Sequence, residues 1–165
     1  MAETVTDSQG NTYALAAGPT TISNSEAQLS QSIYYAKNIA AASAGANTVT
    51  VTFSVAAVYP DIRILEYSGA DPNNPLDTKA ANSGSSTSSS SGSATTTNAT
   101  DLIFGANTVY TYTTGPASGF TQRLLTPYGD IAEDRMVKAT GSYSATAPLG
   151  QSGPWVMQMV AFRAP

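Results

Sequence analysis

One short stretch of this 165-residue chain alternates strictly between apolar and hydroxyl side chains. From Val49 to Val55, valine or phenylalanine takes every second position, and threonine or serine fills the positions between. Successive side chains of a strand point to opposite faces of a sheet, so this period of two predicts a β-strand with one buried face. The chain as a whole is rich in Thr, Val and Tyr and poor in Leu, Glu and Lys, which favours sheets over helices.

Further strands are expected along the chain, bounded by turn-forming residues. Residues 31–39 should form a strand paired with 48–55, and residues 4–15 a hairpin around Gly10. The other predicted strands lie at 61–67, 102–104, 109–112, 120–125, 135–139, 142–147 and 155–162. About nine or ten short strands predict an all-β fold, a two-sheet antiparallel β-sandwich of the jelly-roll type. The length suits one such module spanning residues 1–165.

A low-complexity Ser/Thr-rich stretch covers residues 81–100. It has two interpretations, a flexible linker between two domains or a polar surface hairpin or loop inside one domain. The second is favoured, because neither flank alone has enough strands to close a sandwich and Thr95, Thr96 and Thr97 have good strand propensity.

The charge content argues against two classes of partner. Only 11% of the residues are charged, the net charge is -4, and the seven Lys and Arg are scattered, so we expect no nucleic-acid partner. No apolar run reaches the roughly 20 residues that span a bilayer, so we expect no membrane partner. The first residues lack the basic and apolar regions of a signal peptide. A surface of Ser, Thr, Asn, Gly and Ala is nevertheless typical of secreted, extracellular β-proteins.

The sequence contains no Cys and no His. Disulfides, thiolate nucleophiles, imidazole bases and the usual zinc ligands are therefore excluded. Paired carboxylates remain as a route to a glycosidase, but spacing alone does not place two acids across a sugar, and we expect no enzymatic activity. The acids in or beside predicted strands are Asp61, Glu66, Asp101, Asp130, Glu133 and Asp134.

Asp130, Glu133 and Asp134 form the only acidic cluster. Such oxygen-rich loops suit Ca²⁺, so a structural calcium ion is one interpretation, and a turn whose charges face water or nearby arginines is the other. Glu66 lies in a largely apolar run, where a carboxylate needs a partner. It is a candidate promoter of a Lys–Asn isopeptide bond with Lys37 or Lys138 as the donor.

Tyrosine is the dominant aromatic residue, with nine copies against four Phe and one Trp. Exposed rings on a sheet stack against sugar faces while nearby polar groups bind the hydroxyls. Trp155 opens the last predicted strand, whose two faces both look apolar, which favours a core position over a ligand platform. The candidate carbohydrate-binding residues are Tyr34, Tyr59, Arg63, Tyr67, Tyr110, Tyr112, Trp155 and Gln158.

Several segments resemble a module that recurs in secreted multidomain proteins of soil bacteria. These segments are VTDSQGNTYALA, QSIYYAKNIA, NTVTVTFS, DIRILEYSG, DPNNPLD, GDIAEDRMVKATGSYSATAP and WVMQMVAFR. The modules look like the carbohydrate-binding jelly rolls attached to cellulases. The resemblance implies an extracellular setting, a polysaccharide ligand such as β-glucan or cellulose, and a catalytic domain elsewhere in the parent protein. It implies no particular binding residue.

Two functions from different classes follow from these observations. The first is a non-catalytic carbohydrate-binding module, in which tyrosines stack on glucose rings and Arg63 and Gln158 select hydroxyls. The second is a structural or adhesion module of a bacterial cell-surface protein. Solvent-exposed, coplanar aromatic rings would favour the first, and burial of all the tyrosines would favour the second.

Overall fold

The computed structural model describes residues 2–164, and within that range it is all-β with no helix. Its strands pair antiparallel throughout. Eleven strands follow one another along the chain: β1 Ala2–Asp7, β2 Tyr13–Ser23, β3 Gln28–Ala36, β4 Val49–Phe53, β5 Leu76–Ser90, β6 Ala94–Thr95, β7 Asp101–Val109, β8 Thr121–Leu125, β9 Ile131–Val137, β10 Ser142–Tyr143 and β11 Thr146–Arg163. None of the described segments is a helix long and apolar enough to cross a membrane.

The largest sheet has five strands in the order β5-β11-β7-β9-β8, so that β5 and β8 are its two edges. The long strand β11 lies beside β5 on one side and β7 on the other. Its side chains alternate between two apolar faces. Trp155, Met157 and Met159 join the largest core cluster on one face, and Val160 packs against Ala16 of β2 on the other.

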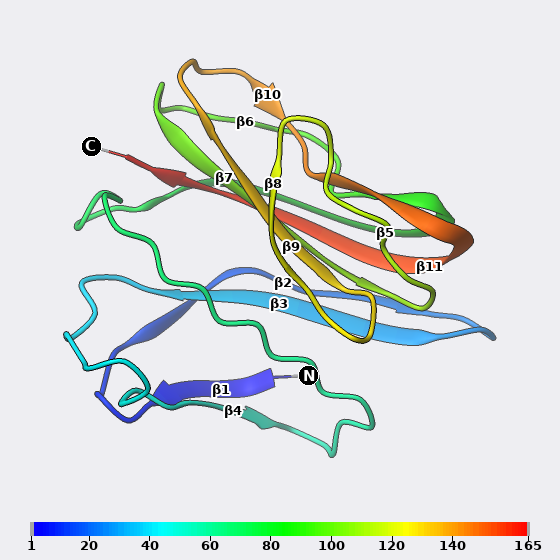
Figure 1. Cartoon of the computed structure of the whole chain (residues 1–165), viewed down its shortest axis with the longest axis horizontal. Coiled ribbons are helices and arrows are strands. Elements are labelled where there is room, and N and C mark those ends of the chain that lie inside the picture. The colour runs from blue at the N-terminus through cyan, green and yellow to red at the C-terminus, as the bar shows by residue number, and fades with distance from the viewer. Residues whose placement is uncertain (1, 165) are drawn as a thin grey trace.

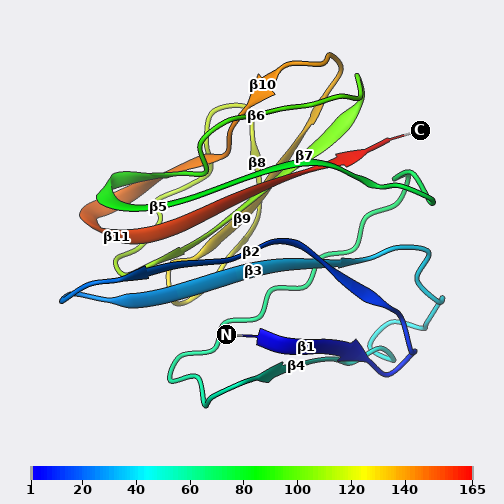
Figure 2. The ribbon, with the colours of Figure 1, turned by 180° about the vertical axis from the view of Figure 1, so that it is seen from behind.

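Two two-stranded ribbons lie on the second of these faces. The β2–β3 ribbon contacts β5, β7 and β11, and the β1–β4 ribbon lies beyond it, farther from the large sheet (Figures 1 and 2). The predicted pairing of 31–39 with 48–55 is therefore wrong, as is the N-terminal hairpin. Instead β3 pairs with β2, and β4 pairs with β1.

The first half of the Ser/Thr-rich stretch is neither a hairpin nor an irregular loop. Residues 81–90 belong to β5, a 15-residue edge strand that runs along β11. Small side chains are required there, since a Cβ at Gly84 would lie 2.8 Å from Cζ2 of Trp155. The indole Nε1 of Trp155 donates a hydrogen bond to Oγ of Ser86 at 2.9 Å. The small side chains of this low-complexity strand therefore leave room for the indole ring of Trp155.

Residues 58–67, called the strap below, cross the same side of the molecule as an extended segment (Figure 1). The strap belongs to no sheet, although its inner positions alternate with its outer ones as in a strand. Asp61, Arg63 and Leu65 point inward, and Leu65 packs against the cluster formed by Phe104, Ala106 and Ala132. The strand predicted at 61–67 is therefore extended, but its main chain pairs with no strand within residues 2–164.

Candidate functional site

Four exposed tyrosines gather where β7 ends. The tyrosine cluster consists of Tyr59, Tyr110, Tyr112 and Tyr128, each between 49% and 79% exposed. The rings of Tyr59 and Tyr128 lie 6.5 Å apart at an angle of 57°. The amide of Thr113 donates to the carbonyl of Gly129 at 2.9 Å, which ties the segment of Tyr112 to the turn that carries Tyr128. Exposed aromatic side chains from three separate segments therefore meet at one end of the molecule.

Tyr112 is held in place by two glycines. A Cβ at Gly150 would lie 2.2 Å from the ring atoms of Tyr112, so the ring rests directly on the main chain of that glycine. Gly129, at a φ of 86°, leaves room for the backbone of Tyr112, since a Cβ there would lie 2.7 Å from its Cα. A ring fixed before binding loses little conformational freedom when a ligand covers it.

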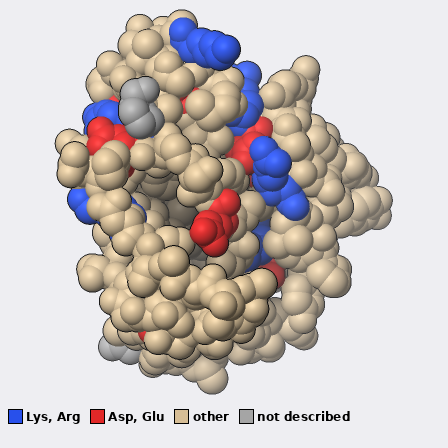
Figure 3. Space-filling model, turned by 60° about the vertical axis from the view of Figure 1, so that its left-hand side comes forward, with Lys and Arg blue, Asp and Glu red and all other residues tan. Residues whose placement is uncertain are grey.

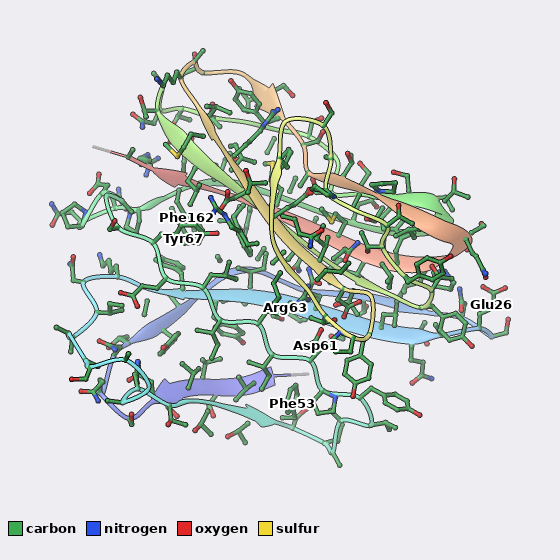
Figure 4. The ribbon with its side chains drawn as sticks, viewed as in Figure 1. Glu26, Phe53, Asp61, Arg63, Tyr67 and Phe162 are labelled. Atoms are coloured by element: carbon green, nitrogen blue, oxygen red, sulfur yellow. The ribbon has the colours of Figure 1, made fainter. Side chains whose placement is uncertain are left out.

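Arg63, which lies near Asp61 on the strap, anchors this segment to the large sheet (Figure 4). Its guanidinium donates to the carbonyl oxygens of Asn107 at 2.7 Å and of Ile131 at 2.8 Å, and to Oε1 of Gln31 at 3.3 Å. Burial lowers the pKa of Arg63, while the charges of Asp130 and Asp61 oppose that shift. The predicted role of Arg63 in selecting sugar hydroxyls is therefore wrong, because its donors are occupied inside the protein.

Asp130 closes the same buried network. Its Oδ1 accepts a hydrogen bond from the amide of Val109 at 2.8 Å. The pKa of Asp130 is raised to about 7, chiefly by burial and also by the neighbouring Asp61, while the charge of Arg63 and the hydrogen bond from Val109 oppose the shift. The network joins the strap, which carries Tyr59, to the turn that carries Tyr128. It thereby fixes two members of the tyrosine cluster relative to each other.

The predicted metal site at Asp130, Glu133 and Asp134 is not formed. Glu133 and Asp134 are adjacent on β9, so they point to opposite faces of the sheet. Glu133 accepts from the amide of Ala117 at 2.8 Å, and burial raises its pKa to about 7. Asp134 accepts from the hydroxyl of Tyr67 at 2.6 Å and from Nε of Arg123 at 2.8 Å. Within residues 2–164, no three acidic side chains are grouped so as to hold a metal ion.

Other predicted binding residues lie outside the cluster. Trp155 is in the core, and Gln158 is fully buried, donating to Oγ1 of Thr20 at 2.8 Å, so neither can reach a ligand. Tyr34 is half-buried on β3. Tyr67 lies at the far end of the strap with its hydroxyl on Asp134, and burial raises its pKa.

Two pairs of carboxylates interact, Asp61 with Asp130 and Asp77 with Asp101, and each interaction raises the pKa of one partner. Carboxyl groups in contact lack the separation of about 5 Å or more that a glycosidase needs, so neither pair fits that role. Glu66 is exposed and forms no ion pair with Lys37 within residues 2–164, and the Nζ of Lys37 donates to the carbonyl of Asn73.

Tyr128 was not among the predicted binding residues. The sequence does indicate its position, because Tyr128 lies between Pro127 and Gly129, and such a turn holds an aromatic ring at the tip of a loop. Charged side chains cover little of the face shown in Figure 3, and the surface is hollowed near its centre.

Comparison with known proteins gives no relative. No family model matches the sequence, and no curated protein or solved structure matches it significantly.

Proposed function

We propose that this chain is a non-catalytic carbohydrate-binding module, a single jelly-roll domain of a secreted, glycan-active protein. The observation that carries the proposal is the exposure of four tyrosine rings at one end of the large sheet. Buried tyrosines would have favoured a purely structural role. β-Glucan is the ligand to test first, and a catalytic domain in the parent protein is the partner that such a module would serve.

Aromatic rings suit sugars because the axial C–H groups of a pyranose form an apolar face that stacks on them. Tyr112 offers a ring already fixed on Gly150. Tyr59 and Tyr128 offer a contacting pair whose rings are tilted by 57°, so this pair is not the coplanar platform expected from the sequence. Polar groups lie beside the rings: Oγ1 of Thr111 donates to the carbonyl of Gln151, whose side chain is exposed. A sugar chain lying across these rings would find both stacking surfaces and hydrogen-bonding groups.

Affinity gels containing soluble β-glucan, run beside a pull-down on insoluble cellulose, test the proposal. We expect retention of the wild-type protein and a roughly two- to tenfold weaker interaction after Tyr112→Ala or Tyr128→Ala, since such aromatic contacts contribute about 0.5–1.5 kcal/mol per ring. Tyr34→Ala is the matched control, because that tyrosine lies outside the cluster. Absence of retention on every plant and microbial glycan tested would exclude the proposed function.

A structural or adhesion module is the second candidate. One observation favours it: the strap and the outer edge of β8 both leave strand-like backbone without a partner.

A further inference from the structure

The strap has the sequence of a strand but not its pairing. Within residues 61–67, no main-chain group forms a hydrogen bond with another main-chain group. Residues of high β-propensity, such as Ile62 and Ile64, ordinarily occupy paired strands. Ile62 is 47% exposed and Ile64 is 62% exposed on the outer side. The strap therefore presents both an apolar row and unpaired backbone groups to the outside.

Strand β8 presents a second free edge close by. It pairs with β9 on one side only, and all five of its residues are exposed, including Leu124 and Leu125. Natural proteins protect such edges with Lys, Pro or a covering segment. Residues 121–125 contain neither Lys nor Pro, and no described segment pairs with their outer side.

The strap and β8 enclose an open groove of about 410 Å³. Its walls are formed by Ile64, Leu65, Glu66 and Tyr67 on one side and by Arg123 and Leu124 on the other. Arg123 uses Nε to bind Asp134, while its two terminal nitrogens make no hydrogen bond within the described chain. Glu66 is exposed and forms no ion pair among the described residues. One wall thus carries a free anionic group, and the other carries unused cationic donors.

This arrangement of charge suits a copy of the same groove. In a two-fold symmetric dimer, the same surface of each copy forms the interface, and each contact occurs twice. Glu66 of one copy can therefore face Arg123 of the other, and the symmetric contact forms as well. We propose that two copies of this chain associate about a two-fold axis through this groove, with Arg123 of each copy binding Glu66 of the other. Ile62, Ile64 and Leu124 form the apolar centre of the interface, and the free backbone of the strap supplies hydrogen bonds across it.

The size of the surface sets the expected affinity. The exposed parts of Ile62, Ile64, Tyr67, Leu124 and Leu125 amount to roughly 400 Å² per copy. With the flanking backbone, the two copies together bury close to the ~1,000 Å² lower limit of specific interfaces. Association across so small an interface is expected to be weak and reversible.

Sedimentation velocity between about 5 and 300 µM measures the association. The expected result is a reversible change from a 16.9 kDa monomer to a species of twice that mass. Ile64→Lys and Glu66→Lys should each weaken the dimer at least tenfold, the first by placing a charge in the apolar centre and the second by opposing Arg123 with a like charge. Leu15→Lys, a comparable exposed position on β2, should leave it unchanged.

Circular dichroism and melting temperatures equal to those of the wild type show that the variants fold. Amide exchange supplies a second readout, because residues 62–66 should gain protection as the protein concentration rises. A protein that stays monomeric at 300 µM would overturn the proposal and leave a strand from a different protein as the occupant of the groove. A dimer that survives both groove variants would overturn it as well, since the interface would then lie elsewhere.

Discussion

The ring of Tyr59, from the strap, lies 6.5 Å from the ring of Tyr128, from the turn between β8 and β9. The contact depends on the layer below, where Arg63 of the strap binds the main chain of β7 and β9 and Asp130 binds the amide of Val109. An exposed aromatic pair is thus positioned by a buried polar network. Mutations can test the roles of the buried network and of the exposed rings independently.

Replacing Arg63 by Met should release the strap. The substitution leaves the carbonyls of Asn107 and Ile131 without their donor and removes the cation beside Asp61 and Asp130. Breaking a buried charge network of this kind costs about 3 kcal/mol of unfolding free energy. Urea denaturation measures the loss, and amide exchange should show faster opening of residues 58–67. Lys138→Ala, at an exposed position, is the control and should change stability by less than about 0.5 kcal/mol.

Gly150→Ala should displace the ring of Tyr112. The new methyl group would lie 2.2 Å from ring atoms, so the ring must move or the strand must shift. We expect a loss of about 1–3 kcal/mol in stability and weaker glycan retention than in the wild type. Thermal melting and affinity gels measure the two effects. Gly115→Ala, where an added Cβ meets no atom within 4 Å, should leave both unchanged. Equal effects of the two variants would contradict the contact between Tyr112 and Gly150.

The alternation of Val49, Val51 and Phe53 with threonine correctly predicts strand β4 and the all-β class. It does not predict the partner of β4, because alternation specifies which face of a strand is buried and not which strand lies beside it. Nearness in sequence favours β3, whereas the structure pairs β4 with β1. Strand β5 escaped prediction because its serines carry no apolar period. Its stability comes from β11, which lies far away in sequence.

The candidate site could be predicted only in part for a related reason. Tyr59, Tyr110 and Tyr112 stand out as tyrosines at strand ends, and all three are exposed. Arg63 and Gln158 are polar residues in apolar segments, and the sequence does not distinguish a ligand-binding group from one that binds the main chain across the core. Only the three-dimensional structure shows that their partners are carbonyls and hydroxyls of other strands.

Stability should fall as the pH rises from about 4 to about 7. The pKa of Asp130 is raised from its ordinary 3.8 to about 7 in the folded protein, so the folded state holds its proton more tightly than the unfolded state. The contribution of Asp130 to the free energy of unfolding is complete below pH 4 and is lost as the pH rises through 7. Glu133, whose pKa burial also raises to about 7, acts in the same direction. Backbone hydrogen bonds hold the pKa of Asp71 below its usual value. Asp71 therefore makes stability rise with pH, and it does so at a lower pH than the range in which Asp130 titrates.

Asp130→Asn tests this assignment. The amide oxygen can still accept from Val109, and the amide nitrogen can donate to Asp61 as the protonated acid does. The variant should therefore be more stable than the wild type at pH 8 by about 4 kcal/mol, and the two should be nearly equal at pH 4. Urea denaturation across this range measures both. An unchanged slope between pH 4 and 7 would show that Asp130 is not the titrating group.

The single tryptophan provides a separate check on which residues meet a ligand. Trp155 is 6% exposed, with Nε1 bonded to Ser86, so its fluorescence should be shifted to shorter wavelengths and resist quenching by acrylamide. Saturating glycan should leave this emission nearly unchanged, because the tyrosine cluster binds at the surface. Gly84→Val, which places a side chain within 2.8 Å of the indole, should shift the emission towards that of exposed tryptophan and cost about 2 kcal/mol of stability. Strong quenching by glycan in the wild type would instead place the ligand at Trp155 and displace the tyrosine cluster from its assigned role.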